Sequence, residues 1–531
     1  MRNLSTLAWR VYDAPTKPWH GVVADTEGDD SVYVMRVERR DGVSQLTLAH
    51  ITPTGTEELA VLEVASAPPH VPDVADFRLL ADGGSSVNHM PAICVIGSGG
   101  DIVLMPVDEE ASAPAEVVGS VDQGILAAAW SPEEDVLVLI TGGEKRLIVM
   151  TREFEVMSET MLSTEAFGDD QPVNVGWGSK STQFHGSEGK QAAMAAANAP
   201  EESDPRGPLV PEDDGLPRIS WRGDGAFFVT SSAEASHDTV HRILRTYTRT
   251  GTLSATSDRS VRGISHVLAC RPTGNLIATT QRMGGPWAPG RHGRHDVVFF
   301  ERNGLRHGEF SLREEHGSVP DVPGVSAEPL PPWSCEHQIR LVSWNADGSV
   351  LAVVLQRAGL HVLQLWTSGN YHWYLKHEST YEHLHAMTWH PEQPLTWYVS
   401  HARVEKRTMC LETACSRGMP PHDAACASVV DGHMLYLTPF RLQNVPPPMC
   451  AVAIVDTPQH TVPHVPPATP VHVAWTTQSV EDQTTDIVAI LYPDASVHVW
   501  SVEYGSLGAA HPRPRPPLKP RREGRITRLV G

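Results

Sequence analysis

The stretch VSWNADGSVLAVVL at residues 342–355 shows the pattern that decides the fold. It reads apolar–x–Trp, then a polar turn containing Asp-Gly, then a run of small and β-branched residues. Such a pattern predicts two strands joined by a tight turn, with one large side chain at the end of the first strand. The same unit recurs at AAAWSPEEDVLVLIT (127–141), ISWRGDGAFFVTSS (219–232) and MTWHPEQPLTWYVS (387–400), and with Cys in the Trp position at LACRPTGNLIATTQ (268–281).

Each unit is followed by a further strand with period-2 alternation, as in KRLIVMTR (145–152) and DVVFFER (296–302). Strand pairs that return roughly every 45 to 90 residues are typical of a β-propeller whose blades are separated by insertions. Two weaker copies precede them, VYVMRVERRDGVSQLTLAHI (32–51) and AICVIGSGGDIVLMPV (92–107). The sequence therefore predicts an all-β, WD-repeat-like propeller of about seven blades, with the tryptophans packed between neighbouring sheets.

The pattern restarts after a proline-rich hinge, NVPPPM at 444–449, which cannot continue a strand ladder. Trp475 and Trp500 mark strands of the same type beyond the hinge. The expected domains are a first propeller at 1–440 with an insertion at about 156–217, a partial second propeller at 441–510, and a basic Pro-rich tail at 511–531. Because a propeller typically has at least four blades, either the chain is truncated or the remaining blades lie outside this sequence.

The insertion holds two segments of unusual composition. KQAAMAAANA (190–199) predicts at most a short helix, and the acidic, Pro-rich EESDPRGPLVPEDDG (201–215) predicts a mobile loop. The segment GWGSKSTQFHGSEGKQ superficially resembles a phosphate-binding loop. However, Phe184 stands where that loop needs glycine and Gln191 where it needs Ser or Thr, so nucleotide binding is not expected.

The net charge of −21 argues against a nucleic-acid-binding body, since phosphate contacts need clustered Lys and Arg. Basic residues do gather in HPRPRPPLKPRREGRITR (511–528), which reads as a solvated linker or as a contact for RNA or acidic protein. The sequence shows no secretory signal and no apolar run of about 18 residues. A cytoplasmic protein, possibly also nuclear, is therefore expected.

Candidate metal and catalytic residues lack the spacings that their chemistry needs. Cys410, Cys415 and Cys426 are too far apart in sequence for paired zinc ligands, even with His422 between them. His292 with His295, and His383 with His385, have no carboxylate at metal-ligand spacing. No G-x-S-x-G elbow is present. We therefore predict no catalytic, cofactor-binding or metal site, and a binding protein rather than an enzyme.

Several longer sequence segments identify a protein family more specifically than the general propeller repeat does. They are VNVGWGSKSTQFHGSEGK (173–190), DVVFFERNGLRHGEF (296–310) and LQLWTSGNYHWYLKHE (363–378), together with DQGILAAAWS (122–131) and the opening MRNL. In this order they closely resemble the amino-terminal half of the scaffold subunit of Elongator, a complex that modifies wobble uridines of transfer RNA. The resemblance extends from residue 1 to about 450 and continues more weakly beyond.

The resemblance implies a non-catalytic scaffold with two tandem propellers followed by a helical-repeat half. The scaffold would hold a second propeller subunit and a separate catalytic subunit of radical-S-adenosylmethionine and acetyltransferase-like type. It would support formation of 5-carboxymethyl-type groups on the wobble uridine, contacting tRNA only indirectly. Because the helical half is absent from this sequence, homodimerisation is not expected. The alternative is a generic β-propeller adaptor in another assembly.

The aromatic run Tyr371, His372, Trp373 and Tyr374 could serve as an interaction surface or as blade core. Alternation along a strand would bury about half of these side chains. We expect Trp373 to belong to the core.

Overall fold

The computed structural model describes residues 2–525 apart from the following segments and positions. These are 13–16, 82–90, 108–114, 163–167, 169–206, 237–238, 259–260, 288–294, 313–336, 417–424, 441–450, 457–467, 481–482 and 503–519, with the single residues 27, 29, 41, 358 and 452. Within the described residues the elements are strands, and they form four-stranded antiparallel sheets. In that part of the chain no helix is long and apolar enough to cross a membrane.

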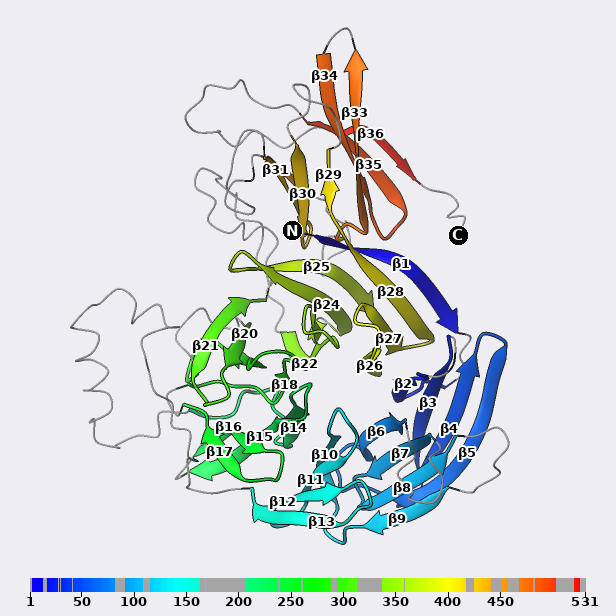
Figure 1. The fold of residues 1–531 in the computed structure, drawn as a ribbon, viewed down its shortest axis with the longest axis vertical. Coiled ribbons are helices and arrows are strands. Elements are labelled where there is room, and N and C mark those ends of the chain that lie inside the picture. Colours follow the sequence, from blue (N-terminus) through cyan, green and yellow to red (C-terminus); the bar gives the residue numbers. More distant parts are fainter. Residues whose placement is uncertain are drawn as a thin grey trace, which may run out of the picture.

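Seven of these sheets form one ring (Figure 1). The first three are β2 (Gly21–Ala24), β3 (Val32–Arg40), β4 (Val43–Thr52) and β5 (Gly55–Ala65); β6 (Val74–Leu80), β7 (Ala92–Gly97), β8 (Asp101–Pro106) and β9 (Glu116–Ser120); and β10 (Ile125–Trp130), β11 (Val136–Thr141), β12 (Arg146–Thr151) and β13 (Val156–Met161). The next three are β14 (Arg218–Trp221), β15 (Phe227–Ser236), β16 (Thr239–Thr248) and β17 (Leu253–Thr256); β18 (Ala269–Cys270), β19 (Ile277–Arg282), β20 (His295–Phe300) and β21 (Arg306–Ser311); and β22 (His337–Trp344), β23 (Leu351–Arg357), β24 (Leu360–Gly369) and β25 (His372–Tyr381). The seventh contains β26 (Ala386–Trp389), β27 (Thr396–Ser400), β28 (Val404–Glu412) and β1 (Asn3–Tyr12).

The seven-bladed propeller predicted from the repeated unit is confirmed. The repeated tryptophans end the first strand of their sheets, and Cys270 ends β18 in the same position. The Trp221 indole N–H donates to the Ala129 carbonyl oxygen of the preceding sheet at 3.1 Å. The Cys270 thiol approaches the Ser220 carbonyl oxygen at 3.3 Å in the equivalent place. The Trp389 indole N–H likewise donates to the Ser343 carbonyl oxygen at 3.3 Å, so in the fourth, fifth and seventh sheets this position is bonded to the preceding sheet. Cys can replace Trp there because it keeps a donor.

Ring closure uses the two ends of the propeller sequence. β1 pairs antiparallel with β28, from Asn3 opposite Glu412 to Tyr12 opposite Val404. The first strand of the chain therefore completes the seventh sheet, leaving the ring without an open seam. The repeated unit gave no sign of this pairing, because β1 lies outside it.

Two further sheets stand beside the ring (Figure 1). They are β29 (Ala414–Cys415), β30 (Cys426–Asp431), β31 (Met434–Pro439) and β32 (Ala453–Asp456), and then β33 (His472–Val480), β34 (Gln483–Leu491), β35 (Ser496–Val502) and β36 (Pro520–Arg525). The expected boundary at residue 440 falls between two paired strands of one sheet, so we propose the division between β28 and β29 instead. Residues 520–525, within the basic Pro-rich tail expected at 511–531, form a strand paired with β35.

Buried polar groups join this second unit to the ring. The Asn3 side chain donates to the Ser428 carbonyl at 3.0 Å and accepts from the Val430 N–H at 2.8 Å. Lys376, of which 1% is exposed, donates to the Val430 carbonyl at 2.8 Å. Asp431 accepts from the Leu375 N–H at 2.9 Å. Directional bonds of this kind fix the orientation of the two units.

Candidate functional site

The segment 207–217, here named the strap, is the end of the insertion between β13 and β14 and lies against two sheets of the ring. The Leu209 N–H donates to the Val240 carbonyl in β16 at 2.9 Å. The Trp287 indole N–H, from the connection after β19, donates to the Leu209 carbonyl at 3.4 Å. Val210 is buried beside them, with 2% exposed. The strap thus bridges the fourth and fifth sheets.

Glu212 anchors the strap to the fifth sheet. One carboxylate oxygen lies 2.8 Å from an Arg282 guanidinium nitrogen, and the other lies 2.9 Å from Nε2 of His295. All three side chains are at most 5% exposed. Burial alone would raise the pKa of Glu212, but the hydrogen bond and charge of His295, with the charge of Arg282, outweigh it and hold this pKa below its usual value.

Asp213 anchors the strap to the fourth sheet. Its two carboxylate oxygens accept from Nη2 and Nε of Arg242 at 2.5 and 2.6 Å, and both side chains are fully buried. Arg242 also donates to the carbonyls of Leu216 and Ser231, at 3.1 and 3.3 Å. A bidentate arginine pair with further carbonyl acceptors is the arrangement that compensates best for burying both charges.

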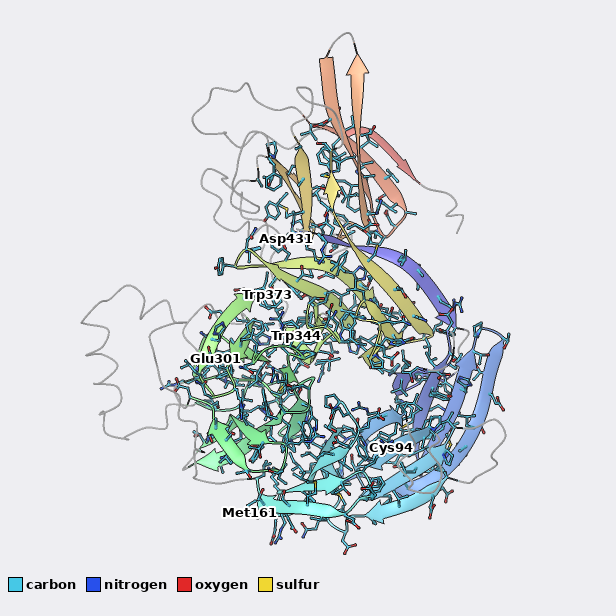
Figure 2. All side chains as sticks on the ribbon, viewed as in Figure 1. Cys94, Met161, Glu301, Trp344, Trp373 and Asp431 are labelled. Atoms are coloured by element: carbon cyan, nitrogen blue, oxygen red, sulfur yellow. The ribbon has the colours of Figure 1, made fainter. Side chains whose placement is uncertain are left out.

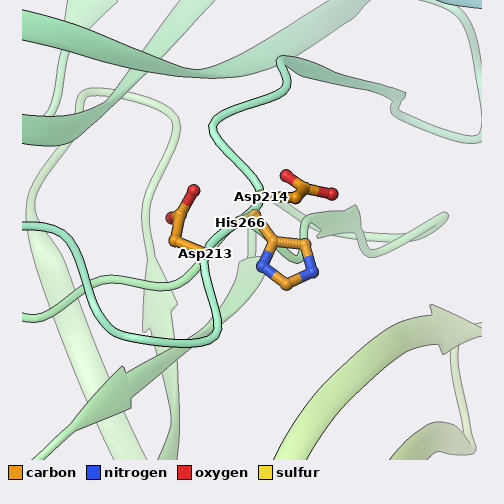
Figure 3. A group of neighbouring side chains, drawn as sticks. All are labelled: Asp213, Asp214 and His266. Carbon is orange, nitrogen blue, oxygen red and sulfur yellow. The ribbon is translucent and has the colours of Figure 1, made fainter. Parts of the chain in front are cut away.

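Asp214 completes the acidic run and pairs with Arg218. Burial opposes ionisation, yet the charges of Arg218 and His266 keep the pKa of Asp214 below its usual value. His266 is 3% exposed, and its burial lowers its own pKa. Asp213, Asp214 and His266 offer ligand atoms within 4.8 Å of one another (Figure 3). Since Arg242 already occupies both oxygens of Asp213, a cation there would meet a guanidinium, and the geometry favours an ion-pair cluster.

The strap corrects one prediction from the sequence. Residues 201–215 were expected to form a mobile loop, but 207–215 are held by buried ion pairs. The missed signal lies in the partners: Arg242 and Arg282 stand in strands that contain no acidic residue of their own, TVHRILRTYT and IATTQR. An arginine buried at such a position requires a carboxylate.

Other residues singled out in the sequence are separated by the fold or fall outside the described part. His292, His422, the 190–199 segment and the phosphate-loop-like words lie outside the described residues. Cys426 is buried, whereas Cys410 lies at a partly exposed position on β28, with its sulfur 3.6 Å from the Ser5 carbonyl oxygen. Among the described residues these cysteines form no group with converging metal ligands.

The aromatic run divides between core and surface. Trp373 stacks on Phe310 and Phe299 of the fifth sheet, with ring centroids 4.6 and 5.2 Å apart. It lies in the same part of the ring as Trp344 (Figure 2). Tyr374 is 1% exposed, whereas Tyr371 is fully exposed. Trp373 thus packs against the core of the fifth and sixth sheets, as predicted, but it is only partly buried.

The outer strands of the first three sheets form a surface that we name the acidic rim: β5, β9 and β13. Its exposed apolar side chains are Leu59, Val61, Val117, Val156, Met157 and Met161, between 36% and 58% accessible. Its acids are Glu57, Glu58, Glu63, Glu116 and Glu159, and these three strands contain no Lys or Arg. Met161 lies at the outer edge of the ring in Figure 2. Exposed apolar groups among carboxylates suit a partner with apolar and basic side chains.

A closed seven-sheet ring followed by the sheets of a second unit defines a tandem β-propeller protein. The family model described as the first N-terminal β-propeller of ELP1 matches residues 1–392, and that of its second N-terminal β-propeller matches residues 429–513. The chain belongs to the Elongator complex protein 1 family.

Curated relatives agree across distant eukaryotes. Elongator complex protein 1 of Mus musculus is 33% identical over 482 residues, covering 86% of this chain and 31% of that protein. The Schizosaccharomyces pombe protein of the same name is 35% identical over 362 residues, covering 68% of this chain and 26% of that protein. The chain thus spans about a quarter to a third of the length of these relatives. The match to the solved structure of the Dos1 propeller covers 76% of this chain and 95% of the Dos1 chain. The sequence identity is 8% and the TM-score is 0.42.

Proposed function

We propose that this chain supplies the N-terminal propellers of a non-catalytic scaffold subunit of the Elongator complex, and so supports 5-carboxymethyl-type modification of wobble uridine in tRNA. The observation that carries the proposal is the match of two ELP1 propeller models, in order, to the ring and to the sheets beside it. The relatives' names place those proteins in the Elongator complex.

The site chemistry supports a binding role. Within the described residues, the group of carboxylates and imidazole that converges is Asp213, Asp214 and His266. Arg242 and Arg218 neutralise its acids. A general base or a nucleophile's partner needs an accessible, unpaired group, which this cluster does not offer. Its role is to hold the strap against the ring.

The partners that we propose are the catalytic radical-S-adenosylmethionine and acetyltransferase-like subunit and the second propeller subunit. The acidic rim is the surface we assign to one of them, because it exposes apolar side chains among carboxylates and its three strands contain no Lys or Arg. Transfer RNA would be reached through these partners, in agreement with a net charge of −21. The cytoplasm is the proposed site of action, with the nucleus as a second compartment.

The test is a gene deletion complemented with wild-type or variant alleles, read by mass spectrometry of tRNA nucleosides and by co-purification of Elongator subunits. Deletion should remove 5-carboxymethyl-type uridines. The variant Val156→Glu with Met161→Glu should reduce co-purification, whereas Leu7→Glu, an exposed apolar position on β1, should not. An unchanged nucleoside profile after deletion would instead support an adaptor in another assembly. A normal profile in the rim variant alone would refute only the assignment of the rim.

A further inference from the structure

Four histidines from three neighbouring sheets lie on one face of the ring, and we name them the histidine arc. They are His20, which precedes β2, His361 near the start of β24, and His383 and His385 between β25 and β26. In a four-stranded antiparallel sheet, the connection between the second and third strands and the connection that enters the first strand are at the same end. The topology therefore brings these histidines together where the sixth, seventh and first sheets meet.

The rings of the arc form a continuous row. Ring centroids are 6.2 Å apart between His361 and His383, 6.5 Å between His383 and His385, and 5.7 Å between His385 and His20. His361 is partly exposed and the other three are exposed. The pair His383–His385, noted in the sequence, is thus extended by two histidines that only the fold brings near.

The spacing of the row matches the side chains of an extended peptide. An extended chain advances about 3.3 Å per residue, and successive side chains point to opposite faces. Side chains two positions apart therefore lie on one face, roughly 6.6 Å from each other. A peptide lying along the arc could thus place every second side chain opposite one imidazole ring.

Two rings of the arc are fixed as hydrogen-bond donors. Nδ1 of His20 accepts from the Val37 N–H at 3.1 Å, and Nδ1 of His361 accepts from the Leu384 N–H at 2.7 Å. The second contact is shorter than the 3.2 Å between the same nitrogen and the Leu384 carbonyl oxygen, so it determines the tautomer. Each neutral ring therefore carries its proton on Nε2, where it can donate to an anionic oxygen.

The other two rings can gain a positive charge. In the part of the chain that the structure describes, no hydrogen bond joins the ring of His383 or His385 to another group. Burial lowers the pKa of His385, and the charges of the neighbouring histidines lower it further: His20, His383, His361 and His401. A bound carboxylate would offset this repulsion and favour the protonated ring.

Basic side chains at the same end of these sheets flank the arc. They are Lys17, Arg36, Arg39, Arg40, Arg340 and Arg403. The carboxylates at this end are Glu38, Asp73, Glu382 and Glu405. Most of them are already paired: Glu38 with Lys17 and Arg40, Asp73 with Arg39, and Glu405 with His401 and Arg407. Arg340 and Arg403 are exposed, and Arg340 donates to the side-chain oxygens of Gln338 and Gln356.

The charges that act on the arc are mainly positive. Burial lowers the pKa of His361, and the charges of His383 and Arg340 add to this effect. Burial also lowers the pKa of His20, and the charge of Arg36 adds to it. Two carboxylates act on His20 in the opposite direction, Asp73 and Glu38. The arc is therefore a locally cationic surface on a chain of net charge −21.

We propose that the histidine arc, with Arg340 at one end, binds an extended acidic peptide that carries a carboxylate at every second residue. Imidazole N–H groups and a guanidinium are the donors that carboxylates accept from. A site for single-stranded nucleic acid would add exposed aromatic side chains on which bases stack, whereas Trp19, beside His20, is 2% exposed. The acidic rim suits a basic partner, so the two surfaces would take partners of opposite charge. The inference does not rest on the proposed scaffold function.

The experiment is fluorescence anisotropy of a labelled peptide of alternating Glu and Ser, titrated with the whole chain. We expect a micromolar dissociation constant that rises with salt, and no binding of the same peptide with Gln in place of Glu. His383→Ala with His385→Ala should weaken binding about tenfold, and Arg340→Ala should also weaken it. The matched control is His307→Ala with His472→Ala, two histidines about half exposed elsewhere, and should bind as wild type.

The pH dependence distinguishes the arc from a general charge effect. A bound carboxylate raises the pKa of His385, so affinity is greatest when the ring is protonated and falls as the pH rises through that value. Wild type should therefore bind several-fold more tightly at about pH 6 than at about pH 7.5. The His383→Ala, His385→Ala variant should lose most of this difference.

Three results would overturn the proposal: equal binding of the Glu and Gln peptides, wild-type affinity in the His383→Ala, His385→Ala variant, or tighter binding of labelled oligouridine than of the acidic peptide. The last would assign the arc to nucleic acid. Because the replaced side chains are exposed, the double variant should melt like wild type. If it melts lower, the titration is repeated with His383→Gln and His385→Gln, and wild-type affinity there contradicts the assignment equally.

Discussion

Replacing Asp213 with alanine would remove the carboxylate that neutralises a fully buried arginine. Both side chains of the Asp213–Arg242 pair are 0% exposed, and the pair is bidentate. Removing one partner of a buried ion pair costs about 3 to 5 kcal/mol, because the remaining charge stays buried. Asp214, 4.0 Å from Arg242 and partly exposed, compensates only weakly, so we expect the lower end of this range. The range corresponds to a change of roughly 150-fold to 5,000-fold in the unfolding equilibrium of the ring.

The assay is urea-induced unfolding followed by tryptophan fluorescence, with limited proteolysis of the strap as a second readout. Glu57→Ala, on exposed β5, is the control and should change stability by less than about 0.5 kcal/mol. Asp213→Leu combined with Arg242→Met replaces the pair by apolar groups and should recover most of the loss. A cost below about 1 kcal/mol for Asp213→Ala would refute the reasoning, since it would mean that Asp214, 4.0 Å from Arg242, and the carbonyls of Leu216 and Ser231 satisfy the guanidinium without Asp213.

Two other variants test separate parts of the structure. The pKa of Glu212 is lower in the folded protein than its ordinary value of 4.5. Its ion pairs with Arg282 and His295 therefore stabilise the fold fully at pH values above 4.5. This stabilisation is lost as the pH falls through the lower pKa of the folded state. Unfolding free energies measured across this acidic range should fall more steeply for wild type than for Glu212→Gln, and parallel curves would contradict the assignment. Trp373→Ala should lower the free energy of unfolding by about 3 kcal/mol, because it empties the space between Phe299, Phe310 and Trp344. Tyr371→Ala, at a fully exposed position, should leave the melting temperature unchanged. An unchanged melting temperature in Trp373→Ala with loss of partner binding would make this residue an interaction surface.

The sequence predicts the propeller well because the deciding signal is local. Trp344, the Asp-Gly turn and the strand after it lie within one short stretch. The residues that form the first hairpin of a blade are therefore neighbours in the sequence. The strap could not be predicted in this way. From the sequence its acids Glu212 and Asp213 are predicted to be solvent-exposed, because they follow proline and belong to a run of acidic residues. Their partners Arg242 and Arg282 lie in strands that come later in the sequence. Local composition cannot distinguish a solvated acid from one buried against a distant arginine.

The placement of β1 has a consequence for how the protein is made. Asn3 pairs with Glu412, 409 positions later (412 − 3), so β1 leaves the ribosome long before its partner and must wait for one of the last strands of the ring. At about 5 to 20 residues per second, that interval is roughly 20 to 80 seconds. Throughout it, β1 is an unpaired strand that carries Leu7 and Trp9, which are apolar and could template wrong pairings. Since Asn3 is itself buried between the two units, a bulky group attached directly before it would interfere with the pairing that completes the ring.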